Sequence, residues 1–169
     1  MALLPAPLYI GVALVVDRFE PDPLGMIALT FLSGAALATL IAYLLALLGD
    51  AVLGGSLDPA AGQVFESSMA GPVVEEVAKG LVLYGIYRRH RDEFTGVVDG
   101  IVYGATVALG FATVQNVLLY GAMEASADGA ASLFVVRGLV SPFADPLFTA
   151  MTGAGLGIAA RSRTRTASS

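Results

Sequence analysis

The chain has 169 residues, of which 56% are hydrophobic and 14% are charged. A soluble domain carries roughly 25% charged residues, so this composition excludes an ordinary water-soluble fold and indicates a single membrane-embedded domain. The absence of cysteine excludes disulfides, thiolate metal sites and a cysteine nucleophile, and there is no basic tract of the kind that binds nucleic acid.

Five apolar stretches are candidates to cross a bilayer, which takes about 20 residues per helix. In chain order they are Met1–Val16, Leu24–Leu48, Val73–Tyr87, Val97–Gly121 and Pro146–Ala160. The first lacks the basic leading region of a signal peptide, so we expect a retained span. Pro59–Ala70 and Ala130–Ser141 are expected to be short interfacial or re-entrant helices. The sequence thus predicts an all-α, polytopic transmembrane bundle of about five spans.

Positive charge predicts the orientation of this bundle in the cell membrane. Cytoplasmic loops are enriched in Lys and Arg. Seven of the nine such residues fall in Asp17–Pro23, in Arg88–Gly96 or after Ala160. This places the N-terminus outside and the C-terminus in the cytoplasm. We expect residues 1–160 to form the domain and 161–169 to be a disordered cytoplasmic tail.

Three ionisable residues interrupt the third apolar stretch. Glu75, Glu76 and Lys79 are spaced so that the lysine shares a helix face with both acids. Charged groups within spans are costly and usually functional. One interpretation is an ion cluster that only orients the helix. The other interpretation is functional. Two acids and one lysine leave one net negative charge, which a metal, a shared proton or a catalytic water would satisfy.

Two later stretches carry small and polar residues at helical spacing, which lets helices approach closely. One stripe comprises Gly100, Gly104, Ala108, Phe111 and Gln115, and the other comprises Asp145, Thr149, Gly153 and Gly157. Asp145 precedes Pro146 and could simply cap a helix. In the predicted topology, however, Gln115 and Asp145 lie at the same depth as the two glutamates, toward the outer face. We therefore expect one shared site there.

At these residues the chain resembles the PrsW family of intramembrane proteases, which is distantly similar to the CPBP membrane proteases. The resemblance covers nearly the whole chain. It comprises the segments Asp17–Pro23, Pro72–Gly80, Asp99–Gly104, Gly110–Asn116 and Pro146–Thr149. Family motifs are a double glutamate with a lysine, a Phe-x-x-x-Glu on the next span and a histidine on the last. The first matches Glu75, Glu76 and Lys79, whereas Gln115 replaces the family glutamate and Asp145 the family histidine.

The resemblance implies an endopeptidase in the lipid bilayer that cuts single-pass membrane proteins, such as membrane-anchored anti-sigma factors, near the outer face. Glu75 or Glu76 would be the general base, or would bind a divalent metal such as zinc together with Asp145. Lys79 would neutralise charge. Gln115 and Asp145 would fill the third and fourth site positions.

The two replacements leave several interpretations open. Glutamine cannot act as a base and aspartate cannot replace imidazole, so the protease would be impaired in this form. Alternatively, the site works with Glu75, Glu76 and Asp145 alone. A non-catalytic protein that binds a partner's transmembrane helix is the second hypothesis. A small ion transporter is the third, and it ranks lowest because the sequence has no evident inverted repeat.

Overall fold

The computed structural model of the chain describes residues 23–53, 70–123 and 141–167, and the regular structure in these ranges is entirely helical. The elements are α2 (Leu24–Ser33), the π-helical segment η2 (Gly34–Ala38), α3 (Thr39–Leu53), α5 (Gly71–Arg89), α6 (Val97–Met123) and α8 (Ser141–Ala167). The predicted all-α class is confirmed for this part of the chain.

Two helical stretches are long and apolar enough to cross a membrane, Leu24–Val52 and Val97–Leu118, and Pro146–Ala160 is a shorter apolar helix. The predicted count of about five spans is not confirmed. The span expected at Met1–Val16 lies outside the described residues, as do nearly all residues of the short helices expected at Pro59–Ala70 and Ala130–Ser141. Val73–Tyr87 does lie within helix α5, but its charged residues make that helix less apolar than the other two.

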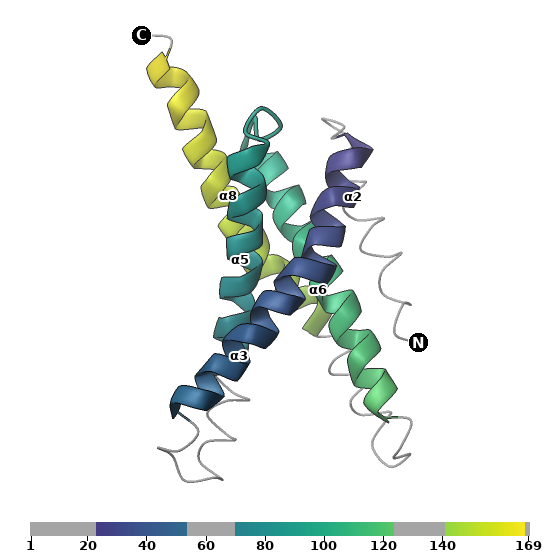
Figure 1. Cartoon of the computed structure of the whole chain (residues 1–169). Coiled ribbons are helices and arrows are strands. Elements are labelled where there is room, and N and C mark those ends of the chain that lie inside the picture. Colours follow the sequence, from purple (N-terminus) through teal and green to yellow (C-terminus); the bar gives the residue numbers. More distant parts are fainter. Residues whose placement is uncertain (1–22, 54–69, 124–140, 168–169) are drawn as a thin grey trace.

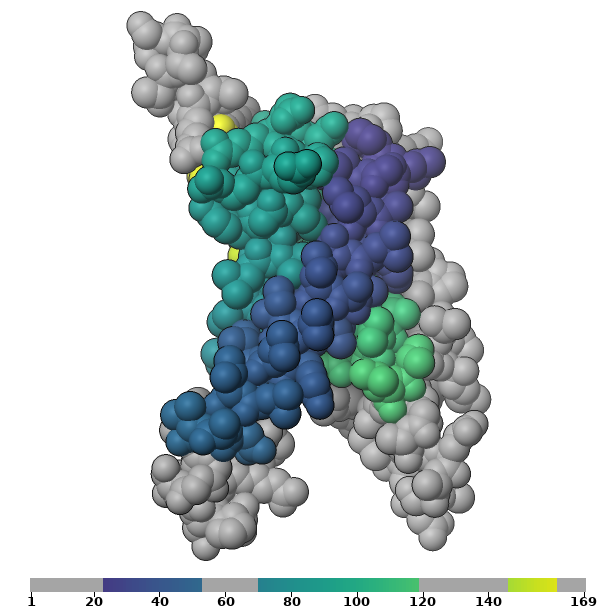
Figure 2. Space-filling model, in the orientation of Figure 1, coloured from purple at the N-terminus to yellow at the C-terminus, as the bar shows by residue number. Residues whose placement is uncertain are grey.

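Helix α6 is the centre of the bundle. It packs most extensively against α8 and also contacts α2, η2 and α5. The continuous helix formed by α2, η2 and α3 runs diagonally across α5 and α6 (Figure 1). In the space-filling view this helix covers the middle of the molecule, with the lower part of α6 visible beside it (Figure 2). Each of these helices therefore contributes to one shared core.

Glycines allow α6 and α8 to approach until their backbones touch. A Cβ on Gly153 would overlap the carbonyl group of Gly100, and one on Gly157 would overlap that of Gly96. A Cβ on Gly104 would lie 2.6 Å from the carbonyl oxygen of Thr149. The close approach predicted for the small residues of the two stripes is thus confirmed for Gly100, Gly104, Gly153 and Gly157, and the structure shows that these two stripes pack against each other. This contact fixes where the polar residues of α6 and α8 lie relative to α5.

The close contact gives a stability prediction for Gly153→Val. The added side chain meets backbone rather than a movable side chain, so the helices must separate, and we expect a loss of more than about 3 kcal/mol. Gly155→Val is the matched control, because Gly155 is an exposed residue of the same helix and a Cβ there meets nothing within 4 Å. Thermal denaturation in detergent measures both. Equal melting temperatures for the two variants would contradict the packing described here.

The turn between α5 and α6 is held by one buried aspartate. Asp99 accepts hydrogen bonds from the backbone N–H groups of Thr95 (2.7 Å) and Gly96 (3.0 Å) and from the Thr95 hydroxyl (2.8 Å). It thereby satisfies donors at the start of α6 that have no partner within the helix. At the same end of these helices, the ring of Phe94 makes edge-to-face contacts with the rings of Tyr87 and Tyr103. Asp99 is therefore a capping residue, far from the glutamates of α5.

Helix α8 extends further than the sequence indicated. It continues to Ala167, so it includes most of the segment 161–169 that was expected to be disordered. The physical reason is that residues 161–167 contain neither proline nor glycine, so nothing in the sequence interrupts the helix that precedes them. The cytoplasmic location of this segment stays a prediction.

Candidate active site

Two adjacent glutamates near the start of α5 face different neighbours. Successive residues of a helix are separated by about 100° around its axis. Glu75 therefore faces α6, where its Oε1 accepts a hydrogen bond from the Nε2 of Gln115 at 3.1 Å. Glu76 faces α8, where its Oε2 accepts a hydrogen bond from the hydroxyl of Thr149 at 3.0 Å. One turn of α5 thus brings side chains of three helices together.

Lys79 lies one turn after Glu76 and is completely buried. Its Nζ is 2.5 Å from Oε1 of Glu76, and it also lies 4.9 Å from the ring centroid of the buried Phe111 on α6. A buried ammonium group is costly unless it is paired and hydrogen-bonded, and an aromatic face adds attraction. The lysine therefore balances the charge of Glu76 and fixes its position.

Four of the five predicted site residues form two hydrogen-bonded pairs at the start of α5, Glu76 with Lys79 and Glu75 with Gln115. Asp145 lies in α8 one helical turn before Thr149, but its side chain is outside the described residues. Thr149, which is buried, was not predicted as a site residue. The sequence feature that could have pointed to Thr149 is its place on the stripe that begins at Asp145. An uncharged hydroxyl in an apolar helix, however, gave no reason to select it as a site residue.

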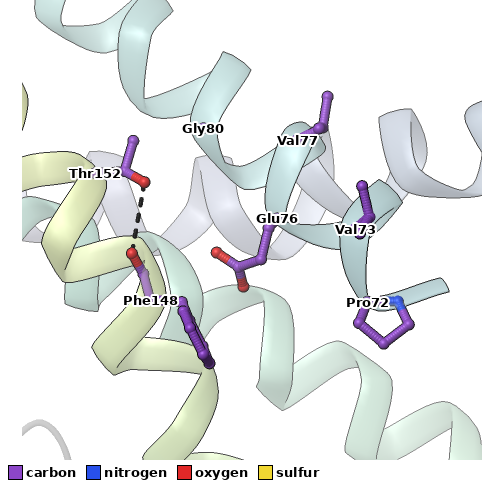
Figure 3. Close-up of a pocket in the computed structure, with 7 residues that line it drawn as sticks. All are labelled: Pro72, Val73, Glu76, Val77, Gly80, Phe148 and Thr152. Atoms are coloured by element: carbon purple, nitrogen blue, oxygen red, sulfur yellow. Dashed lines mark hydrogen bonds between the residues drawn. The ribbon is translucent and has the colours of Figure 1, made fainter. Parts of the chain in front are cut away.

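A pocket of about 680 Å³ opens beside Glu76, between α5 and α8. It is lined by Pro72, Val73, Glu76, Val77, Gly80, Phe148 and Thr152. The Glu76 carboxylate points toward α8, with Phe148 and Thr152 on the opposite wall (Figure 3). The volume falls within the range of small-ligand sites. Glu76 is thus a carboxylate fixed on one side by Lys79 and Thr149 and open to the pocket on the other.

The described side chains do not make a catalytic zinc site. Zinc in such sites takes three protein ligands, commonly histidines with a carboxylate. The chain has one histidine, His90, at the opposite end of α5 and roughly 21 Å along the helix from Glu76. Within the described part of the chain, no group of three His, Cys, Asp or Glu residues could hold a metal ion. Of the predicted metal ligands, Glu75 and Glu76 are adjacent, but both carboxylates are already hydrogen-bonded.

These features define a class of protein: a helical membrane protein with a fixed carboxylate pair in its interior and a pocket that reaches one of the two acids. The comparisons with known proteins identify the family. Residues 22–169 match the model of the PrsW family intramembrane metalloprotease. The chain belongs to the PrsW family.

Curated relatives bear the same name. The chain is 38% identical over 102 residues to Protease PrsW of Geobacillus kaustophilus, covering 60% of this chain and 42% of that protein. It is 33% identical over 124 residues to Protease PrsW of Bacillus subtilis, covering 69% of this chain and 53% of that protein. The chain thus spans about half the length of the curated relatives it matches. No solved structure matches it.

Proposed function

We propose that this chain is an intramembrane endopeptidase that cleaves single-pass membrane proteins of the anti-sigma-factor type, with its activity reduced by the residues at positions 115 and 145. The observation that carries the proposal is the Glu76 carboxylate, held by Lys79 and Thr149 at the wall of an apolar pocket. Membership of the PrsW family supports the reaction class.

Glu76 is the general base in this proposal. Its side chain is 30% exposed, whereas that of Lys79 is completely buried. A water molecule in the pocket gives a proton to Glu76 as its oxygen attacks the carbonyl carbon of the scissile peptide. The proton then passes to the nitrogen of the leaving amine as the C–N bond breaks. Lys79 and Thr149 are positioning residues, since they act by holding the carboxylate.

Glu75 and Gln115 form the second part of the site. The Gln115 amide donates to Glu75 and holds that carboxylate against α6. We assign the fourth position to Asp145 because it precedes Thr149 by one turn of α8. The family description includes a metal, and a divalent ion would polarise the scissile carbonyl or the attacking water. The described side chains alone do not supply its ligands, so a chelator arm belongs in every activity assay.

We place the site nearer the outer face of the cell membrane. The α5–α6 turn and the end of α8 lie at the same end of the molecule (Figure 1). This end carries Arg88, Arg89, Arg91, Arg161, Arg163 and Arg165. Positive charge favours the cytoplasm. The glutamates lie at the start of α5, toward the opposite end.

This orientation predicts opposite labelling of two introduced cysteines. The chain has no cysteine of its own, so Asp92→Cys in the α5–α6 turn and Asp50→Cys near the end of α3 each give a single exposed thiol. An impermeant maleimide added to intact cells should label Cys at position 50 at least tenfold more than at position 92, since the bilayer shields the cytoplasmic thiol. The reverse pattern would move the site to the cytoplasmic side.

One observation favours a second candidate, a protein that binds transmembrane helices without cutting them. Gln115 is a hydrogen-bond donor to Glu75 where the family motif has an acid, so the site has one ionisable group fewer than that motif. Both candidates use the same scaffold and the same pocket. They differ in whether the bound segment is hydrolysed.

The test is a purified single-pass reporter incubated in liposomes with the chain, with and without chelator, and followed by mass spectrometry of the products. We expect slow cleavage at one position in or beside the membrane segment of the reporter. Chelator-sensitive cleavage would identify a metal-dependent reaction, and chelator-insensitive cleavage a glutamate acting directly on water. If the reporter binds but is cut neither by this chain nor by its Gln115→Glu, Asp145→His variant, the protease proposal is rejected in favour of a protein that only binds transmembrane helices.

A further inference from the structure

We infer that the pocket between α5 and α8 binds one apolar side chain of the substrate's membrane segment, and that Gly80 sets the size of the side chain that fits. This inference rests on the proposed function, because it assigns the pocket to the segment that is cut. It goes beyond that function by naming the residue that determines which segments bind.

The walls of the pocket fit an apolar group. Apart from Glu76 and Thr152, the lining residues are proline, valine, glycine and phenylalanine. The Thr152 hydroxyl donates a hydrogen bond to the carbonyl oxygen of Phe148 at 3.5 Å, and its methyl group is the atom nearest to where a Cβ of Gly80 would be. The hydroxyl is therefore directed to the backbone while the methyl faces Gly80, and among the described lining residues Glu76 is the one ionisable group.

The pocket lies where a membrane segment can reach it from the bilayer. Val77 and Phe148, on its two sides, are 48% and 59% exposed. Further large apolar side chains of α5 and α8 are exposed beside them, namely Val73, Leu81, Leu147 and Met151. In a membrane protein such a surface faces lipid. Because Glu76 belongs to both the pocket and the carboxylate pair, a side chain seated here places its own peptide bond beside the proposed base.

Gly80 has no side chain and therefore leaves space in this pocket. A Cβ there would lie 3.9 Å from the Thr152 methyl, which is an ordinary van der Waals contact. A larger residue therefore fits the fold but occupies pocket volume. Gly85 is the matched control, since it is an exposed residue of the same helix, lies outside the pocket and has nothing within 4 Å of its Cβ position. Gly80→Val and Gly85→Val thus differ mainly in what they do to the pocket.

The experiment uses synthetic single-pass leucine–alanine peptides, each with a diazirine analogue of leucine at one position, and the full chain in liposomes. Crosslink yield and attachment sites are measured by mass spectrometry. We expect one position of the probe to give the highest yield, with attachment to the lining residues, Val77 and Phe148 among them. In Gly80→Val this yield should fall about tenfold, since a methylene or two in an apolar pocket changes binding by that order. Gly85→Val should match the unmodified chain.

Equal yields from Gly80→Val and Gly85→Val, attachment confined to α2 and α3, or no attachment at all would overturn the inference. The readout is binding, so it separates this inference from the proposed activity. Gly80-dependent crosslinking without cleavage by any form would keep the pocket assignment and reject the protease. Reporter cleavage at equal rates by both glycine variants, with no attachment in the pocket, would reject the pocket assignment and keep the protease.

Discussion

The double substitution Gln115→Glu, Asp145→His is expected to raise reporter cleavage about a hundredfold or more above that of the chain as it stands. The Gln115 amide nitrogen is 3.1 Å from Oε1 of Glu75, so a carboxylate at position 115 would lie beside an existing one. Two carboxylates at this separation favour a shared proton or a bound cation. An imidazole at position 145 would add a group that donates or accepts a proton near neutral pH. General acid–base groups each contribute typically a hundredfold or more.

The two single substitutions accompany the double one in the same liposome assay. We expect each to give less than the double variant, because groups that act as a unit are not additive. Melting temperatures confirm that the proteins compared are folded. Equal cleavage by the double variant and the unmodified chain would show that positions 115 and 145 do not belong to the machinery.

The second large effect is expected for Lys79→Met. The lysine is completely buried and is paired with Glu76, so its removal leaves an uncompensated carboxylate in the bundle. Breaking a fully buried ion pair in this way costs about 3–5 kcal/mol, and because the Glu76 side chain is 30% exposed we expect a loss of about 2–3 kcal/mol here. The double variant Glu76→Gln, Lys79→Met removes both charges and should recover most of the lost stability. Denaturation in detergent gives the coupling between the two positions by a double-mutant cycle.

Arg89→Met is the control for this series. Arg89 is an exposed cation of the same helix, in its last turn, so its loss should change the free energy of unfolding by less than about 1 kcal/mol. A Lys79→Met variant no less stable than Arg89→Met would mean that the lysine does not compensate Glu76. Failure of the double variant to recover stability would point instead to the contact of Lys79 with Phe111.

The sequence predicted those parts of the site that depend on spacing within a helix. The approach of Lys79 to a glutamate follows from a separation of three or four residues. The helical spacing of the glycines likewise predicted a close-packing face on α6 and another on α8, and it predicted the direction of Gln115 toward the bundle interior. That these two faces pack against each other came from the structure. These features need only the helical period and the rule that small residues mark close contacts.

Other features depend on tertiary packing that no local pattern specifies. Thr149 bonds to Glu76 because the glycine contact sets the height of α8 against α5, and its own residue type carries no such information. The π-helical segment Gly34–Ala38 has no sequence signature, and it lies where Gly34 packs against the backbone of Val107. The different partners of Glu75 and Glu76 could likewise not be predicted without knowing which helix lies on each side of α5.

The most direct test of the central claim is Glu76→Gln in the background of Gln115→Glu, Asp145→His. The amide preserves the size of the side chain, keeps one acceptor oxygen for Lys79 and presents an NH2 group that can donate to the Thr149 hydroxyl, but it cannot take a proton from water. We expect reporter cleavage to fall at least a hundredfold while crosslinking of the apolar probe to the pocket is retained. A cleavage rate unchanged by this substitution would contradict the assignment of Glu76 as the base.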